Sequence, residues 1–294
     1  MTSPCRRCPW RRVGSLGRQS VRSMRRLALR GALFAGLLAG TAGCTSNAFT
    51  RLGMPVPVTQ QGKVTLTLWQ GSWVAAWAVG FMVWGLIIWA VIFHRKRSAT
   101  QPPPHQVRYN LPIEMLYTVV PFIMVGVLFY FTARDENYID SLSARPNVTV
   151  NVTGFQWSWQ FQYQGYKVPG SPTGDVTITG QPWSPLIGNS GLPTLVIPDH
   201  EVVRFNLVST DVIHSFWIVP FEFKRDVIPG HPNHFEVTPT KTGFYYGRCT
   251  ELCGLYHSRM LFRVRIVTPA QFNTWIHAQQ AAQTRAAASG GGAQ

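Results

Sequence analysis

Acidic residues are scarce in this sequence of 294 residues, which has 12 Asp and Glu against 27 Lys and Arg. The formal charge of +15 would suit a nucleic-acid partner, but residues 1–43 hold nine arginines and no acidic residue, so the rest of the chain carries only +6. Between residues 141 and 280 there are ten basic and eight acidic residues. This balance leaves no basic stripe for a phosphate backbone, and we expect no nucleic-acid partner.

Cysteine is also scarce, with five residues in the whole chain. Cys5 and Cys8 have the spacing of half a zinc site, but no second pair follows, and both lie in the N-terminal leader. We therefore assign them no metal role. Cys249 and Cys253 are the two cysteines of the C-terminal region.

The leader, residues 1–43, has the pattern of a signal peptide: an arginine-rich segment followed by an apolar run that is too short to span a membrane. Small residues precede Cys44, as in a bacterial lipoprotein processing site where the cysteine is acylated. Thr41 weakens that match, and ordinary cleavage or a retained anchor stays an alternative. Met24 is an alternative start, because the residues after it form a compact signal peptide alone. Residues 44–63 are then a short exported segment.

Residues 64–134 are predicted to form a two-helix transmembrane hairpin. The first apolar run, 66–93, is long enough at about 1.5 Å per residue to cross a hydrocarbon core of about 30 Å. The second run, 115–131, is shorter but sufficient, and Pro121 within it should kink the helix.

Charges at the ends of these runs predict the orientation of the hairpin. The basic cluster 94–97 follows the first run, whereas Asp135 and Glu136 follow the second. The positive-inside rule therefore places the loop 94–112 in the cytoplasm and everything after about residue 134 outside. We expect a multi-pass protein of a bacterial cell membrane, in contact with lipid, with its C-terminal domain on the outer (periplasmic or extracytoplasmic) face.

Residues 135–277 are predicted to form an all-β exported domain. Apolar residues alternate with polar ones around 148–152, 203–207 and 262–266, which is typical of half-buried strands. Gly, Pro, Ser and Asn cluster between the strands, especially over 164–198, as in a Greek-key sandwich or barrel. Thr268-Pro269 predicts the start of a short helix that ends near His277, and the tail 278–294 is expected to be disordered.

Soft metal donors gather in the segment 249–260. It holds two cysteines, a histidine and a methionine, and a further histidine precedes it: Cys249, Cys253, His257, Met260 and His214. Thiolate, imidazole and thioether together favour copper over hard cations. A mononuclear blue-copper site needs one cysteine and two histidines, so the second thiolate indicates two metal ions bridged by sulfur, with one histidine each. The alternative is a Cys249–Cys253 disulfide with the other residues as bystanders.

At this point the sequence resembles the family of cytochrome c oxidase subunit II. The pattern Cys-x-Glu-x-Cys-x3-His-x2-Met over 249–260 is complete, and the stretches 209–215, 226–230 and 243–247 also match. The resemblance covers about residues 64–277 and implies a cupredoxin-like Greek-key barrel anchored by the helical hairpin. Thr250 and Arg259 depart from the residues common in the family, and residues 164–200 are longer than usual.

The resemblance implies a ligand set for a dinuclear copper A centre (two Cu). Both cysteines, Cys249 and Cys253, would bridge the coppers. His214 and Met260 would complete one copper, and His257 with the main-chain carbonyl of Glu251 the other. The side chain of Glu251 would hold a magnesium ion shared with subunit I.

Two further residues acquire roles through the resemblance. Trp157 lies where electrons would arrive from a c-type cytochrome, although Trp-rich segments more often serve core packing. Glu114 lies at the mouth of a proton-uptake channel into subunit I, although a carboxylate at a helix N-terminus is also favoured by the helix dipole. Neither role follows from residue type alone.

The implied function is an electron relay from a c-type cytochrome through this chain to the haems of subunit I, where oxygen is reduced and protons are pumped. The expected partners are oxidase subunits I and III. The domain is not acidic overall, so it lacks the surface that would attract a strongly basic soluble cytochrome c. In this it resembles the actinobacterial version of the subunit. The electron donor of that version is a membrane-bound c-type cytochrome that belongs to a partner complex in a supercomplex. The chain alone should not reduce oxygen.

Three other classes of protein share part of this pattern. A copper-delivery or thiol-redox protein also uses Cys-x3-Cys with a distant histidine, but Met260 and the two spans argue against it. A quinol-oxidase type of subunit II would lack the cysteines. The copper domain of nitrous oxide reductase lacks these spans and has a large partner domain.

Overall fold

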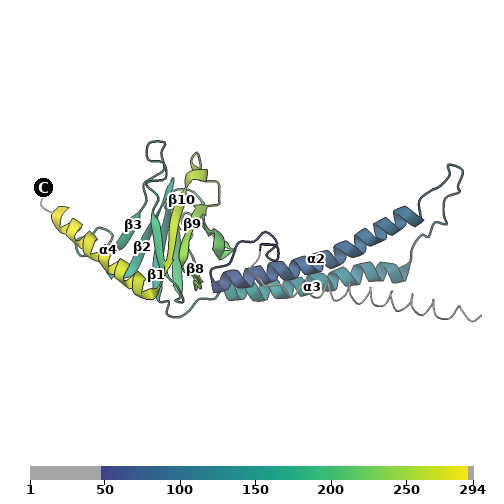
Figure 1. The fold of residues 1–294 in the computed structure, drawn as a ribbon, viewed down its shortest axis with the longest axis horizontal. Coiled ribbons are helices and arrows are strands. Elements are labelled where there is room, and N and C mark those ends of the chain that lie inside the picture. The colour runs from purple at the N-terminus through teal and green to yellow at the C-terminus, as the bar shows by residue number, and fades with distance from the viewer. Residues whose placement is uncertain (1–47, 291–294) are drawn as a thin grey trace, which may run out of the picture. The chain divides into compact units, whose positions relative to one another are not determined.

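The computed structural model describes residues 48–290. The predicted signal peptide, the alternative start at Met24, the predicted lipidation site Cys44 and residues 291–294 lie outside the described residues. From Arg51 onward the chain forms one compact unit. It contains two long helices, ten strands, two short 3-10 helices and a C-terminal helix (Figure 1).

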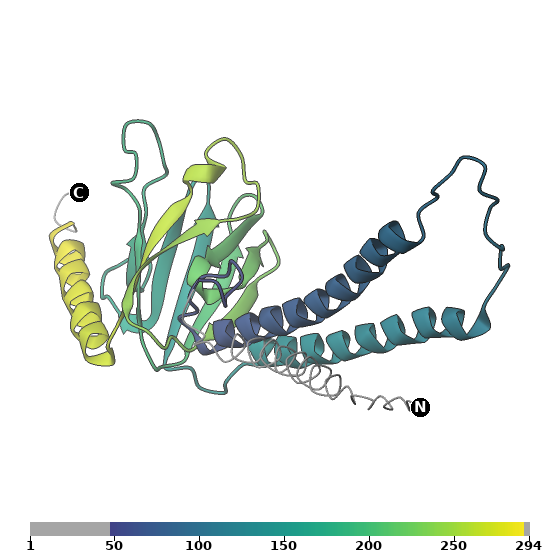
Figure 2. The same cartoon turned by 45° about the vertical axis from the view of Figure 1, so that its right-hand side comes forward.

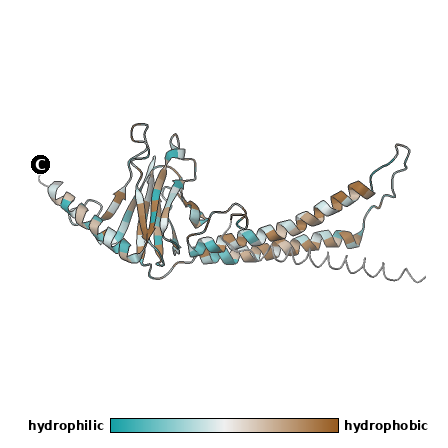
Figure 3. Ribbon diagram, in the orientation of Figure 1, coloured by the Kyte–Doolittle hydropathy of each residue, from teal (hydrophilic) through white to brown (hydrophobic). Residues whose placement is uncertain are grey.

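The two long helices are α2 (Gln60–Phe93) and α3 (Leu111–Asp140). Both are long and apolar enough to cross a membrane, and their most apolar windows bury no residue within the chain. Figure 3 shows hydrophobic residues along most of both helices. Two apolar helices ahead of a β-domain were predicted, and the structure confirms them.

Both helices extend beyond the predicted apolar runs because polar residues continue them. Thr59 caps α2 by accepting a hydrogen bond from the backbone N–H of Gly62 at 2.9 Å, so the helix begins in the polar segment before Leu66. Asn110 caps α3 and Pro112 fills its first turn, which favours a helix start. The helix continues through Pro121 and ends at Asp140, where Ser141 donates to the carbonyl of Tyr138.

The β-domain consists of two five-stranded sheets. The first has the order β3-β2-β1-β5-β8, with these bounds: β1 Val148–Phe155, β2 Ser158–Lys167, β3 Asp175–Thr179, β5 Val203–Ser209 and β8 Asn233–Val237. The second has the order β4-β10-β9-β6-β7: β4 Thr194–Pro198, β6 His214–Ile218, β7 Lys224–Val227, β9 Gly243–Cys249 and β10 Leu261–Val267. Short 3-10 helices are η1 (Val219–Phe221) and η2 (His257–Arg259).

Each sheet mixes parallel and antiparallel neighbours, because β1 pairs in parallel with β5 and β10 in parallel with β4. Both parallel pairs join strands that are distant in sequence, so long connections link the strands of each sheet. The apolar residues that alternate along β1 are buried while those between them are half-buried, as period-two patterning predicts. The all-β fold class is therefore confirmed.

Aromatic side chains fill the space between the sheets. The ring of Phe216 on β6 stacks on that of Phe262 on β10 at 4.9 Å, and the fully buried Trp159 on β2 packs edge-on against both. Offset and edge-on ring contacts of this kind stabilise cores beyond simple area burial. This core supports the strand ends from which the candidate metal donors project.

The segment 164–198, in which Gly, Pro, Ser and Asn cluster, also contains two short strands, β3 and β4. Both strands are rich in β-branched residues, which favour extended backbone. They pair with the edges of β2 and β10 respectively.

The expectation of a disordered tail from residue 278 is wrong for the described residues, because helix α4 runs from Pro269 to Gly290 (Figure 2). Alanine, glutamine and arginine in this segment have high helix propensity. Two glutamines also bind the sheet: Gln280 donates to the carbonyl of Lys167 at 2.6 Å, and Gln283 bonds both backbone groups of Thr177. These contacts compensate for the entropy of ordering the helix.

Candidate metal centre

Neighbouring strands bring the candidate donors together. His214 is the first residue of β6 and Cys249 the last of β9, and these strands pair with Phe216 opposite Cys249. The chain then turns back, so that Met260 immediately precedes β10. The backbone N–H of Cys249 donates to the carbonyl of Met260 at 3.0 Å and closes the segment 249–260, which we call the donor loop.

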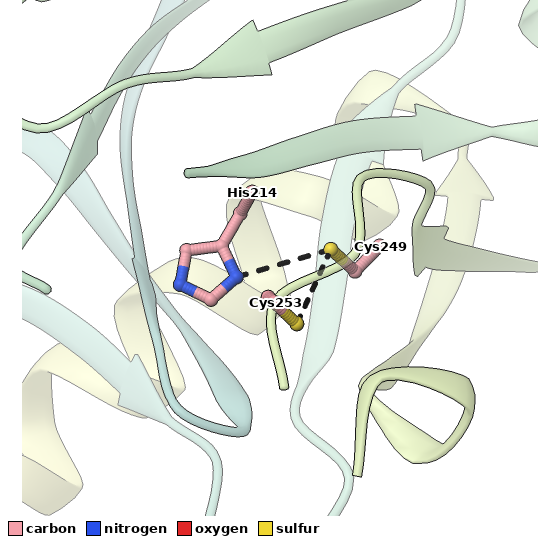
Figure 4. Close-up of side chains that lie close together, drawn as sticks. All are labelled: His214, Cys249 and Cys253. Atoms are coloured by element: carbon pink, nitrogen blue, oxygen red, sulfur yellow. Dashed lines mark hydrogen bonds between the residues drawn. The ribbon is translucent and has the colours of Figure 1, made fainter. Parts of the chain in front are cut away.

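The sulfur and nitrogen atoms of these residues converge on one point. Figure 4 shows His214, Cys249 and Cys253 turned toward one another. The two Sγ atoms are 3.8 Å apart, Nδ1 of His214 is 3.8 Å from Sγ of Cys249, and the donor atoms of the three residues lie within 4.8 Å of one another. Both cysteines are free thiols, so the structure does not contain the disulfide considered above.

The donor loop adds three further donors around the thiols. Nδ1 of His257 lies 3.5 Å from Sγ of Cys253, and Sδ of Met260 lies 3.8 Å from the same sulfur. The main-chain oxygen of Glu251 lies 3.2 Å from Sγ of Cys249. The four other donors that the resemblance implies therefore all lie close to the two cysteine sulfurs.

Burial shields the centre from water. His214, Cys249, Cys253 and Met260 are buried, whereas His257 is half-buried at the surface side. A neutral thiol and a thioether can be buried without the cost of desolvating a charge. Two thiolates, two imidazoles, a thioether and a carbonyl form a soft donor set, which fits copper better than magnesium, calcium or other hard ions.

Asp211 orients His214. Its Oδ1 lies 2.8 Å from Nε2 of the buried histidine, which leaves Nδ1 to face the cysteines. A carboxylate bonded to the outer nitrogen of a metal-ligating histidine fixes the tautomer and raises the basicity of the inner nitrogen. Burial lowers the pKa of His214, but Cys249 and Asp211 outweigh that effect and raise it above its usual value.

The two thiols differ in acidity before a metal binds. Burial raises the pKa of Cys249, but hydrogen bonds with His214 and with backbone groups of Ser215 and Glu251 lower it overall. Burial, followed by repulsion from Cys249, raises the pKa of Cys253. One thiolate therefore forms readily next to His214, whereas the second forms in company with a cation.

Trp157 lies against the donor loop. Its indole N–H donates to the carbonyl of Cys253 at 3.2 Å, and the side chain of Gln156 donates to the same oxygen at 2.8 Å. Gly254 has a positive φ of 117°, and a Cβ there would approach the Trp157 ring to 3.3 Å. Glycine thus allows the loop to turn while it stays in contact with the indole.

Two other predicted residues do not join the cluster through their side chains. The side chain of Glu251 belongs to an exposed residue of the donor loop, and only its main-chain oxygen approaches the sulfurs. Glu114 lies in the first turn of α3, where its carboxylate accepts a hydrogen bond from the backbone N–H of Asn110 at 2.9 Å. This contact is the helix-terminal arrangement considered above for a carboxylate at that position.

Sequence reasoning assigned no role to four residues that contact the centre or its neighbour Trp157: Asp211, Gln156, Tyr256 and Trp183. Asp211 precedes His214 by three residues in a matched stretch, so its spacing was a usable signal. The ring of Tyr256 packs edge-on against Trp157 at 5.0 Å, and that of Trp183 lies 4.8 Å from Tyr256. The position of Trp183 depends on a loop distant in sequence, so no local pattern indicates it.

Comparison with known proteins gives consistent results along the chain. Residues 148–267 match the family described as "Cytochrome C oxidase subunit II, periplasmic domain". The chain is 52% identical over 278 residues to "Probable cytochrome c oxidase subunit 2" of Streptomyces coelicolor, covering 85% of this chain and 86% of the relative. It is 34% identical over 310 residues to "Cytochrome c oxidase subunit 2" of Mycobacterium bovis, covering 91% and 85%.

Among solved structures, the periplasmic domain of subunit II of cytochrome oxidase (CoxB) of Bradyrhizobium japonicum is similar, with 29% sequence identity and a TM-score of 0.39. The alignment covers 48% of this chain and 98% of that domain.

Proposed function

The chain belongs to the cytochrome c oxidase subunit 2 family, and on that basis we propose that it relays electrons from a c-type cytochrome to the haems of subunit I through a dinuclear copper A centre. As a subunit of the oxidase complex it has an electron-transfer role, to which the cluster of His214, Cys249 and Cys253 is suited. Oxygen reduction and proton pumping belong to the assembled complex.

The presence of a second thiol is the observation that supports two copper ions instead of one. Each sulfur has its own imidazole: Nδ1 of His214 beside Cys249, and Nδ1 of His257 beside Cys253. Met260 and the main-chain oxygen of Glu251 supply one weaker donor on either side. A mononuclear site would leave one thiol and one histidine without a role, so the donor set fits two ions bridged by both sulfurs.

Bound copper would supply a one-electron carrier shared between two ions. The protein contributes rigidity, because the donors sit on strand ends and in a loop whose ends are hydrogen-bonded. The backbone N–H of Thr250 donates to the carbonyl of Ser215 at 3.1 Å and ties the donor loop to β6. Donors that cannot move keep the same geometry in both redox states, which favours transfer at small driving force.

We assign Trp157 as the residue through which electrons arrive. Its indole is half-buried, and its hydrogen bond to the Cys253 carbonyl links it to a proposed ligand by a short path. The membrane-bound c-type cytochrome of a partner complex is the proposed donor, since the domain has no acidic excess to attract a strongly basic soluble protein.

The remaining site assignments rest on the family. The exposed side chain of Glu251 would hold a magnesium ion shared with subunit I, because a hard carboxylate suits that ion. Glu114 would admit protons to a channel in subunit I. Subunit III is a further proposed partner.

We also propose the placement of the chain in the cell. The chain has two candidate membrane helices, and the basic loop between them favours a multi-pass arrangement with the β-domain on the outer face of the bacterial cell membrane. The leader would act as a signal peptide, and Cys44 would be acylated. Mass spectrometry of the mature N-terminus tests both statements: an unmodified or retained leader contradicts them.

The channel role of Glu114 has a separate test. Glu114→Ala should slow proton-coupled turnover of the assembled oxidase several-fold while the copper spectra stay unchanged. Glu136→Ala, which removes an exposed carboxylate near the opposite end of the same helix, is the matched control. If the two variants turn over alike, the channel assignment is wrong.

A direct test of the relay uses the full-length chain loaded with copper in detergent. Mixed with a reduced soluble c-type cytochrome under air, it should oxidise the cytochrome once and then stop, with no continuing oxygen consumption. Copper transfer to a chelating acceptor peptide, with no electron acceptance, would instead identify a copper-delivery protein.

A further inference from the structure

Residues 180–193, between β3 and β4, form a loop that is anchored beside the donor loop. The backbone N–H of Gln181 donates to the carbonyl of Gly191 at 3.0 Å and closes the 180–193 loop at its base. The guanidinium of Arg263 on β10 donates to the carbonyls of Asn189 and Leu192 at 3.1 and 3.4 Å. The loop is therefore fixed to the same strand that follows Met260.

Trp183 connects the 180–193 loop to Trp157. Its backbone N–H donates to the carbonyl of Trp157 at 3.3 Å. Its ring lies 4.8 Å from that of Tyr256, which in turn packs edge-on against Trp157 at 5.0 Å. The three rings form a continuous contact, with Tyr256 between the two indoles.

Arg259 covers the other end of this contact. Its guanidinium carbon lies 5.4 Å from the centre of the Trp183 ring, within the range of a cation–π interaction. Tyr256 and Arg259 both belong to the donor loop, on either side of His257. The donor loop therefore contacts the Trp183 ring through two side chains, Tyr256 and Arg259.

The indole nitrogen of Trp183 is buried and has no hydrogen-bond partner among the described residues. A buried donor without a partner disfavours its position, so the packing of the ring, and not its polar atom, keeps Trp183 in place. Phenylalanine would preserve that packing.

From these contacts we propose that Trp183 is a positioning residue for electron uptake: it holds Tyr256, and through it Trp157, in the orientation that keeps the indole N–H of Trp157 on the Cys253 carbonyl. This inference rests on the proposed function of Trp157. One electron would leave the ferrous haem of a c-type cytochrome, which would become ferric, and bound copper would gain that electron. Trp183 itself is neither oxidised nor reduced.

The test compares Trp183→Ala and Trp183→Phe with the unmodified chain in the assembled oxidase. Trp217 provides a matched control, because it is another half-buried tryptophan covered by an arginine, with Arg248 at 5.8 Å. Among the described residues, its ring packs against neither Tyr256 nor Trp157. A soluble c-type cytochrome carrying a photoactive ruthenium label serves as donor. Flash photolysis then separates transfer within the complex from association, and electron paramagnetic resonance monitors the copper.

We expect Trp183→Ala to lower the first-order transfer rate about two- to tenfold, since one aromatic contact shifts a conformational equilibrium by about that factor. Trp183→Phe should restore most of the rate, and Trp217→Ala should leave it unchanged. The association rate, its salt dependence and the copper signal should stay constant in all variants.

Two results overturn the positioning role: an unchanged transfer rate in Trp183→Ala, or a loss of the copper signal together with the rate. The second would make Trp183 a structural support of the donor loop. A missing dinuclear copper signal in the unmodified chain would instead contradict the proposed function, so the two failures are distinguishable.

Discussion

The donor loop and the helical hairpin differ in where their functional side chains find their surroundings: those of the loop lie inside the chain, whereas those of the hairpin face outward. The hydrogen bond from Cys249 to Met260 closes the donor loop, and that from Thr250 to Ser215 ties it to β6, so the chain alone builds the whole cluster of mostly buried donors. The apolar side chains of α2 and α3 are mostly exposed, and the most apolar windows of these helices have no buried residue. The hairpin is complete only with lipid and other subunits around it, whereas the metal centre needs only cations.

This contrast predicts that damage to one region leaves the other intact. The largest expected effect comes from Cys253→Ser, because the hydroxyl of serine is a poor ligand for copper and cannot bridge two ions. The variant should lose the dinuclear copper signal and electron uptake while it still inserts into the membrane. Ser258→Ala, an exposed change on the same loop, is the control, and a retained dinuclear signal in Cys253→Ser would refute the bridging role.

The reciprocal experiment changes the hairpin. Val125 on α3 is exposed within the chain, and Val125→Arg should impair insertion by about 3 kcal/mol, the cost of a charge at the centre of a membrane helix. Protease protection in membrane vesicles measures insertion, and Val125→Leu is the control. Copper binding by the chain recovered in detergent should be unchanged, so lost copper binding would show that the regions depend on each other.

A smaller effect, on copper affinity, is expected from a change to Asp211, which contacts His214 on the side away from the cysteines. Asp211→Asn keeps the shape of the side chain but removes the negative charge that faces Nε2 of His214. Copper affinity should fall about ten- to hundredfold, as for other residues that support a metal-ligating histidine, and the spectrum should recover at high copper concentration. Competition with a chelator measures the affinity. An affinity equal to that of the unmodified chain would show that Asp211 does not tune the ligand.

The smallest effect concerns Glu222, after η1, whose two carboxylate oxygens are buried without a hydrogen-bond partner among the described residues. Burial raises its pKa to about 7, although Arg51 opposes the shift. A carboxyl with a raised folded-state pKa stabilises the fold below its unfolded pKa of about 4.3, and this contribution is lost as the pH rises to 7. The loss should be on the order of 2 kcal/mol.

Glu222→Gln should therefore flatten the fall in thermal stability of the detergent-solubilised chain between about pH 4.5 and 7. Glu201→Gln, at a half-buried carboxylate elsewhere in the β-domain, is the control. An unaltered pH profile in Glu222→Gln would assign the dependence to other groups.

The same contrast explains what the sequence could predict. Five donor side chains were predictable because their spacing on one loop, plus one upstream histidine, is itself the chemical pattern. The main-chain oxygen of Glu251 was implied only by the family resemblance. The strands β1, β5 and β10 were predictable from period-two alternation. The spans were predictable from length and hydropathy, but not their polar extensions, which depend on capping by Thr59 and Asn110.

Contacts between segments that are distant in sequence could not be predicted from local sequence patterns. Helix α4 continues past His277 partly because Gln280 and Gln283 bond strands β2 and β3, which lie more than a hundred residues earlier in the chain. Trp183 reaches Tyr256 for a similar reason, through a loop whose course is fixed by Arg263. Such contacts follow from tertiary packing and carry no periodic signal in the sequence.

The central claim is that Cys249 and Cys253 bridge two coppers in this chain. Its most direct test measures copper per chain and the low-temperature electron paramagnetic resonance spectrum of the full-length protein. The account predicts two coppers per chain that share one unpaired electron, with hyperfine structure from two equivalent copper nuclei. A single copper with a mononuclear spectrum, or a Cys249–Cys253 disulfide that binds none, would contradict it.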